Sequence, residues 1–208
     1  LRQLDKMFRS RGSKLVIKVG EALAVLNGLQ EKHNFDAIYS HYETWNNFAK
    51  NRDENIRRWT ADNSIDWIEY QQNGVVKNLK SRDGWSSLWH KYMQKKICGV
   101  PKKIYCVSEE SDELPSFQDL QLEFDGLKPN TSFGKIDPKF VLESFLNKRG
   151  QNYQREMSGP LLSENSCSRL STHIAFGTIS IRTIFQRTIE QAQKNKDFRF
   201  IFCKSGAQ

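Results

Sequence analysis

Three serines and an arginine lie together in residues 166–171, a stretch with the sequence Ser-Cys-Ser-Arg-Leu-Ser that we call the serine turn. Serine hydroxyls and the free backbone N–H groups at the start of a helix donate hydrogen bonds to phosphate oxygens. An arginine adds a planar, permanently charged group that can hold a diphosphate. The stretch therefore predicts a phosphate-binding turn, and the alternative is an ordinary capped helix with an arginine on its surface.

The chain before residue 105 alternates between short apolar runs and helical patterns. Strands are predicted at residues 15–20, 37–40 and 66–70, where apolar and β-branched residues form such runs. Helices are predicted where apolar residues recur every three or four positions. Their expected apolar stripes are Leu4, Met7 and Phe8; Ala22, Val25, Leu26 and Leu29; Phe48, Ile56 and Trp59; and Trp85, Leu88, Trp89 and Tyr92. Repeated strand–helix units predict an α/β fold, with a Rossmann-like parallel sheet and flanking helices.

Acidic residues, prolines and glycines gather between residues 105 and 136. This composition predicts a long interdomain linker, and an acidic binding tail is the alternative. Four apolar residues would be the ones that pack the linker across the first domain: Leu114, Phe117, Leu120 and Leu122.

The chain from residue 137 onwards is predicted to be helical. Pro138 stands at the start of one helix, a position that suits its fixed backbone angle, and Ser180 is a good N-cap for another. The apolar stripes of these two helices are Val141, Leu142, Phe145 and Leu146; and Ile181, Ile184, Phe185, Thr188, Ile189 and Ala192. Because two or three helices cannot bury such stripes alone, we expect the beginning of an all-α domain that is cut off here.

Charge and cysteine content narrow the class of protein further. Lysine and arginine number 32 against 24 acidic residues, and the net charge of +8 favours a polyanion such as nucleic acid as a partner. The four cysteines and four histidines show no metal-ligand or redox spacing, so no metal site is expected. Reduced thiols, no membrane-length apolar run and no signal pattern predict an intracellular protein, cytoplasmic or nuclear, without a membrane partner.

Taken in order, these motifs resemble the photolyase/cryptochrome family. Residues 166–182 resemble the family segment S-R-L-S-P-Y-L-x-x-G-x-L-S-x-R, and residues 145–153 resemble its F-L-x-x-R helix with a downstream tyrosine. Upstream, residues 52–59 are similar to its R-D-x-x-V-x-x-W helix, and residues 42–47 are similar to its E-x-G-N loop. The resemblance covers most of the chain, and its most specific part is the segment that contains the serine turn.

The resemblance implies that the chain is a fragment with three parts. Residues 1–104 would be the α/β antenna domain without its first strand, residues 105–136 the linker, and residues 137–208 the start of the helical FAD-binding domain. The family's tryptophan electron chain and most of its lesion pocket lie in the missing downstream region. No catalytic residue is therefore expected in this fragment, which should be inactive by itself.

The resemblance also implies FAD as the cofactor. Carried over by position, five residues would contact it: Tyr153, Ser168, Arg169, Leu170 and Ser171. The serines and the arginine are donors to phosphate, and Leu170 can offer its backbone N–H, whereas Tyr153 is explained equally well as a core tyrosine. Cys167 stands where many members have threonine, and Thr172-His173 replaces the usual Pro-Tyr.

The α/β domain of this family often holds an antenna chromophore of the folate or deazaflavin type. Folate-antenna members place Asn-Glu shortly before the Arg-Asp pair, whereas this chain has Phe48-Ala49 there. The resemblance therefore leaves the identity of an antenna open.

The function implied by the resemblance is that of a blue-light DNA photolyase. Such a lyase, a DNA-binding flavoprotein of DNA repair, splits pyrimidine dimers in DNA by electron transfer from the excited reduced flavin. One alternative is a cryptochrome, a blue-light photoreceptor without repair activity. The other is a nucleotide-binding α/β module unrelated to light. The sequence leaves open the type of dimer, cyclobutane or (6-4), and the oligomeric state.

Overall fold

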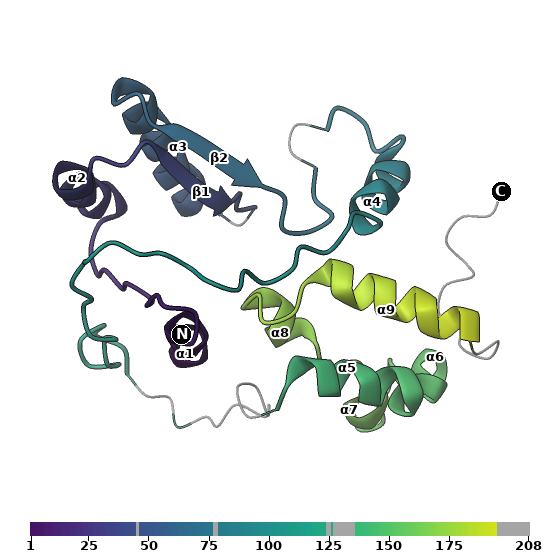
Figure 1. The fold of residues 1–208 in the computed structure, drawn as a ribbon. Coiled ribbons are helices and arrows are strands. Elements are labelled where there is room, and N and C mark those ends of the chain that lie inside the picture. The colour runs from purple at the N-terminus through teal and green to yellow at the C-terminus, as the bar shows by residue number, and fades with distance from the viewer. Residues whose placement is uncertain (45, 77–78, 124–125, 127–135, 195–208) are drawn as a thin grey trace. The chain divides into compact units, whose positions relative to one another are not determined.

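In a computed structural model, the chain forms two compact units (Figure 1). The residues that the structure describes are 1–44, 46–76, 79–123, 126 and 136–194. The first unit, which we call the α/β unit, contains Leu1–Gln72 and Cys98–Lys128. The second, the helical unit, contains Asn73–Ile97 and Pro129–Gln208. The predicted domain limits at residues 104 and 137 stay a prediction.

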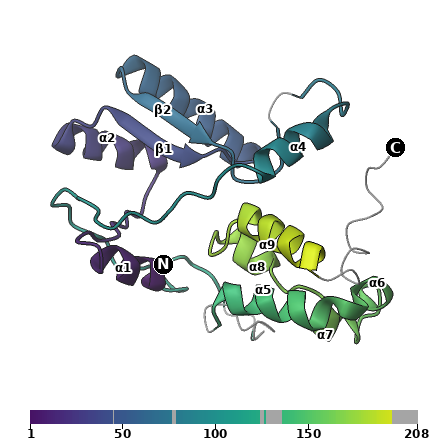
Figure 2. The same cartoon turned by 45° about the vertical axis from the view of Figure 1, so that its right-hand side comes forward.

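The α/β unit is built on a parallel β-α-β arrangement. Its elements are α1 (Arg2–Arg9), α2 (Ala22–His33), β1 (Ala37–His41), α3 (Asn47–Asp62) and β2 (Asp66–Tyr70). β1 and β2 pair in parallel, with Ala37 opposite Asp66. Parallel neighbours need a crossover, which α3 provides while it lies against one face of the sheet (Figures 1 and 2). The strands predicted at residues 37–40 and 66–70 and the α/β class are confirmed.

Polar and aromatic contacts join α3 to β2. The guanidinium of Arg57 lies 4.7 Å from the centre of the Trp67 ring and donates to Glu69 Oε2 at 2.8 Å. On the helix itself, Ala49, Ile56 and Thr60 are buried. Phe48, which was expected in the apolar stripe, is exposed.

The strand predicted at residues 15–20 is wrong, because the structure has no strand there. Ile17 O accepts from Asp112 N at 2.9 Å, but Ile17 N donates to Ser111 Oγ at 3.0 Å and Val19 N donates to Asp112 Oδ2 at 2.7 Å. A β-ladder requires backbone carbonyls at regular intervals on the neighbouring segment. Here the neighbouring segment offers side-chain oxygens instead, so the apolar run has partners without forming a strand.

The linker is anchored to the α/β unit by charge rather than by apolar packing. Glu109 is only 6% exposed, and its carboxylate accepts from Lys18 Nζ at 2.7 Å, Lys32 Nζ at 2.9 Å and His33 Nε2 at 2.6 Å. These donors, Lys18 first, hold the pKa of Glu109 far below its ordinary value. The apolar residues expected to pack the linker are partly or largely exposed: Leu114, Phe117, Leu120 and Leu122.

The helical unit contains six α-helices and one 3₁₀ turn among the described residues. They are α4 (Trp85–Met93), α5 (Pro138–Asn147), η1 (Arg149–Asn152), α6 (Tyr153–Glu156), α7 (Ser163–Ser166), α8 (Ser171–Ala175) and α9 (Ile181–Lys194). α5 begins at Pro138, as predicted, and the Asp137 carboxylate accepts from Lys139 N at 2.8 Å. The predicted N-cap of α9 is confirmed, because Ser180 Oγ accepts from Thr183 N at 3.0 Å.

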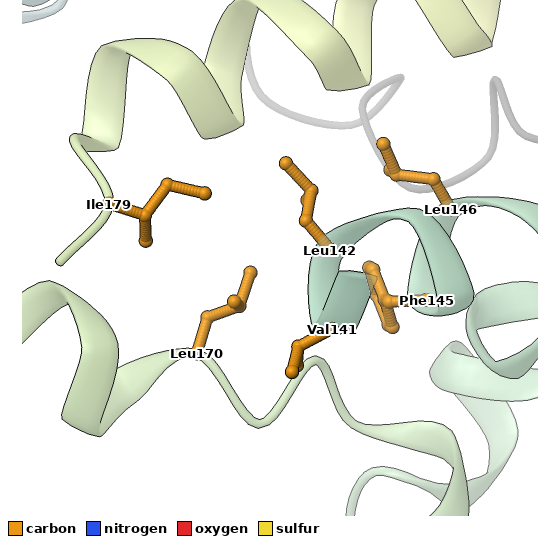
Figure 3. Packing of buried hydrophobic residues seen from close by; sticks show 6 residues of the cluster. All are labelled: Val141, Leu142, Phe145, Leu146, Leu170 and Ile179. Carbon is orange, nitrogen blue, oxygen red and sulfur yellow. The ribbon is translucent and has the colours of Figure 1, made fainter. Parts of the chain in front are cut away.

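The core of the helical unit is the buried face of α5. Its predicted stripe packs against two residues from further along the chain, Leu170 and Ile179 (Figure 3). Leu142 and Leu146 are almost completely buried. Tyr153, Ile174 and Ile184 lie at the edge of this cluster. Leu170 of the serine turn is therefore part of the hydrophobic core.

α4 packs against α9 within the helical unit. The rings of Trp89 and Phe185 meet edge to face, with centroids 5.1 Å apart. Gln186 Nε2 donates to the carbonyls of Met93 at 2.8 Å and Lys95 at 2.9 Å, which satisfies acceptors at the end of α4. The apolar stripe of α4 was predicted as part of the α/β pattern, but its contacts are with the helical unit.

Parts of three predicted segments lie outside the described residues: position 45 of residues 42–47, positions 124–125 and 127–135 of the linker, and the tail from 195 to 208. In the part of the chain that the structure describes, no helix has both the length and the apolar character needed to cross a membrane.

The Glu109 cluster predicts a pH-dependent contribution to stability. Since the folded-state pKa of Glu109 is lowered from 4.5, its contribution is fully present above that pH and is lost as the pH falls towards the folded-state value. We expect Glu109→Gln to destabilise the protein at pH 7, and the difference from the native chain to shrink below about pH 4.5. Denaturant unfolding at several pH values measures this. The exposed neighbour provides the control, Glu110→Gln, and an equal effect of both substitutions would contradict the burial of Glu109.

Candidate phosphate-binding site

The serine turn is held in place by Arg149, the first residue of η1, two positions after the end of α5. Nη2 of Arg149 donates to the carbonyls of Val141 at 3.0 Å and Ser168 at 3.2 Å, and Nη1 donates to the carbonyl of Cys167. Nε donates to Ser144 Oγ at 3.1 Å. One guanidinium thus ties α5 to two successive carbonyls of the serine turn.

A tight turn at Gly150 brings Arg149 close to the end of α5. A Cβ atom on Gly150 would lie 2.8 Å from the carbonyl oxygen of Phe145, a distance that real side chains do not tolerate. Only glycine therefore allows the chain to turn so tightly after α5. The sequence analysis included Arg149 only as part of the F-L-x-x-R motif and did not predict its role. An arginine next to a glycine, just after a helix with a buried apolar face, could have indicated it.

Arg149 is half-buried, and its partners are all neutral. Among the described residues it has three carbonyls and one hydroxyl around it and makes no ion pair. Burial lowers the pKa of Arg149, and the nearby positive charge of Arg169 lowers it further, while Cys167 acts in the opposite direction. Two guanidinium charges without a paired carboxylate create a positive potential at the serine turn, which favours an anion there.

Arg169 has a left-handed backbone conformation, with φ of +59°. Such a conformation costs about 1–2 kcal/mol for a residue with a Cβ atom, and it is held here by the surrounding turn. The side chain is exposed, and Nε donates to the carbonyl of Glu164 at 3.0 Å. This is the one hydrogen bond of the Arg169 side chain within the described part of the chain, so the terminal nitrogens remain available to a ligand.

The other four predicted contact residues differ in what they can offer a ligand. The hydroxyls of Ser168 and Ser171 have no hydrogen-bond partner among the described residues and can donate to an anion. Leu170 is 2% exposed in the apolar core, so only its backbone can serve a ligand. Tyr153 packs edge to face on Phe145, with ring centroids 5.8 Å apart, which gives it a structural role whether or not it also contacts a cofactor.

Comparison with known proteins relates the chain to photolyases. The family model described as DNA photolyase matches residues 1–84. A bacterial class III photolyase from Agrobacterium tumefaciens is similar, with a TM-score of 0.68 and 17% identity, over 97% of this chain and 45% of that one. An archaeal photolyase from Sulfolobus tokodaii, determined with two FAD molecules, is similar with a TM-score of 0.60 and 23% identity, over 97% and 44% of the two chains. No curated protein matches the chain.

Residues 1–84 thus match the DNA photolyase family model, and the chain as a whole has the fold of the two solved photolyases. This confirms the resemblance to the photolyase/cryptochrome family. The chain spans less than half the length of the two solved structures. At these sequence identities the likeness establishes the fold and does not establish the activity.

The left-handed backbone of Arg169 predicts an ordering of two variants. Arg169→Gly should be more stable to unfolding than Arg169→Ala by about 1 kcal/mol, because glycine adopts positive φ without the steric cost that alanine meets. Both substitutions remove the same charge, so their difference isolates the backbone term. Denaturant unfolding measures it. If the alanine variant proved as stable as the glycine variant, the serine turn would have another conformation in solution.

Proposed function

We propose that this chain is part of an FAD-dependent blue-light DNA photolyase, and that the serine turn binds the diphosphate of the flavin. The observation that carries the proposal is the pair of guanidinium groups, Arg149 and Arg169, next to two unpaired hydroxyls. This donor set fits a diphosphate, since charge-assisted hydrogen bonds to phosphate are the strong ones. The photolyase fold supports the proposal, and so does the presence of FAD in the archaeal photolyase.

Each residue has a defined part in this proposal. The terminal nitrogens of Arg169 bind phosphate oxygens, and the hydroxyls of Ser168 and Ser171 donate to the same group. Leu170 anchors the serine turn in the core and offers its backbone N–H, while Tyr153 closes the edge of the site. When bound, FAD would supply light-driven electron transfer to a pyrimidine dimer. The net charge of +8 favours DNA as the partner.

The proposal is tested on the purified protein that contains this chain. We expect a flavin absorption spectrum, and loss of cyclobutane dimers from an oligonucleotide under blue light but not in the dark. A flavin that photoreduces without any dimer loss would favour the cryptochrome alternative, and a protein that binds no flavin would contradict the proposal. An antenna chromophore of the folate or deazaflavin type, which stays a prediction, would add its own absorption band.

Replacement of Arg169 should weaken flavin binding. Arg169→Ala removes a charge-assisted phosphate contact worth about 1.5–3 kcal/mol, which corresponds to a rise in Kd for FAD of about 10- to 150-fold. Fluorescence titration of the flavin measures the Kd. The matched control is Arg155→Ala, which removes an exposed arginine of the same unit. Equal Kd values for the two variants would remove Arg169 from the site.

A further inference from the structure

We infer that Arg149 is a positioning residue, which builds a backbone anion site by orienting two peptide groups of the serine turn. Its guanidinium binds the carbonyls of Cys167 and Ser168, which belong to consecutive peptide groups. In a planar trans peptide the C=O and N–H bonds point in opposite directions. The N–H groups of Ser168 and Arg169, on the same two peptides, therefore point away from Arg149.

These two N–H groups are available to a ligand. Within the described residues, neither of them donates a hydrogen bond. The second of the two residues, Arg169, has left-handed φ, and successive N–H groups in such turns form concave nests that bind anions. The two carbonyls accept hydrogen bonds from Arg149 on one side of the turn, and the two N–H groups face the opposite side. The geometry assigns this nest a phosphate oxygen as its occupant.

Charge and orientation act together in this arrangement. Arg149 is half-buried and surrounded by neutral oxygens, so its charge is not cancelled by a carboxylate among the described residues. It adds positive potential behind the nest while it fixes the peptide planes. A lysine could supply the charge, but a compact ammonium cannot donate to three separate carbonyls in the fixed pattern of a planar guanidinium. The shape of Arg149, and not only its charge, should therefore matter.

The inference rests on the proposed function for the identity of the ligand. Its test distinguishes a failure of the nest from a failure of the flavin proposal. The probes are FAD, inorganic pyrophosphate and riboflavin, which has the isoalloxazine ring without the diphosphate. In the native protein, FAD and pyrophosphate should both slow hydrogen exchange of the Ser168 and Arg169 amides, and riboflavin should not. Protection by pyrophosphate without FAD binding would support the nest and contradict the flavin proposal. Protection by neither anion would overturn the inference.

Three variants test the positioning role. Arg149→Lys should raise the Kd for FAD and for pyrophosphate about tenfold or more, although it keeps the charge, and should leave the Kd for riboflavin unchanged. Arg149→Ala should lose the protection of the Ser168 and Arg169 amides and regain it in millimolar guanidinium chloride. Met93→Ala is the control for general loss of stability, because Met93 is completely buried in α4 and lies outside the core cluster that contains Leu170. The inference is overturned if Arg149→Lys binds pyrophosphate like the native protein, or if Met93→Ala reproduces the selective loss.

Discussion

A half-buried guanidinium with neutral partners sets the local structure of the helical unit. Removing a charge from water is unfavourable unless hydrogen bonds replace the lost hydration, and Arg149 meets this requirement with three carbonyls and one hydroxyl. These acceptors come from α5 and from the serine turn, which lie far apart in the sequence. The position of Arg149 is in turn determined by the apolar face of α5 and by the close contact at Gly150. The core and the candidate site therefore depend on each other.

The basic groups around Glu109 and at the serine turn differ in how their charge is balanced. Around Glu109, two lysines and a histidine surround a carboxylate that belongs to the chain itself, so the cluster is satisfied internally and stabilises the linker. At the serine turn, Arg149 and Arg169 have no ion-pair partner within the described residues. The positive charge at the serine turn is therefore available to an external anion, whereas the charge around Glu109 is not. This contrast is the physical reason to place the phosphate site in the helical unit.

The similarity to photolyases bears on how much of a flavin site this chain could supply. The chain covers less than half of either solved photolyase that it resembles. In the proposed function, the serine turn therefore provides one side of a cofactor site and not an enclosed cavity. A flavin needs most of its surface to be buried when bound. In the proposed function, residues of the serine turn bind and orient the diphosphate, and the remaining contacts come from outside this chain.

The sequence by itself determined the elements whose signals are local. β2 has the predicted bounds, α5 begins at Pro138, and Ser180 caps α9, because periodicity and capping depend on residues a few positions apart. Four of the five residues predicted to contact a cofactor lie in one short motif, the serine turn, so the sequence was enough to select them as candidates. Their roles in binding a cofactor remain a proposal.

The tertiary structure decided everything that depends on distant partners. Residues 15–20 have the composition of a strand, but the segment beside them supplies side-chain oxygens in place of a β-ladder. α4 has the apolar stripe of a helix, yet its contacts with Phe185 and Gln186 of α9 show which unit it packs in. The role of Arg149 needed Cys167 and Ser168, which follow it by 18 and 19 positions. No local pattern encodes such contacts, because they form only when the core has brought the two segments together.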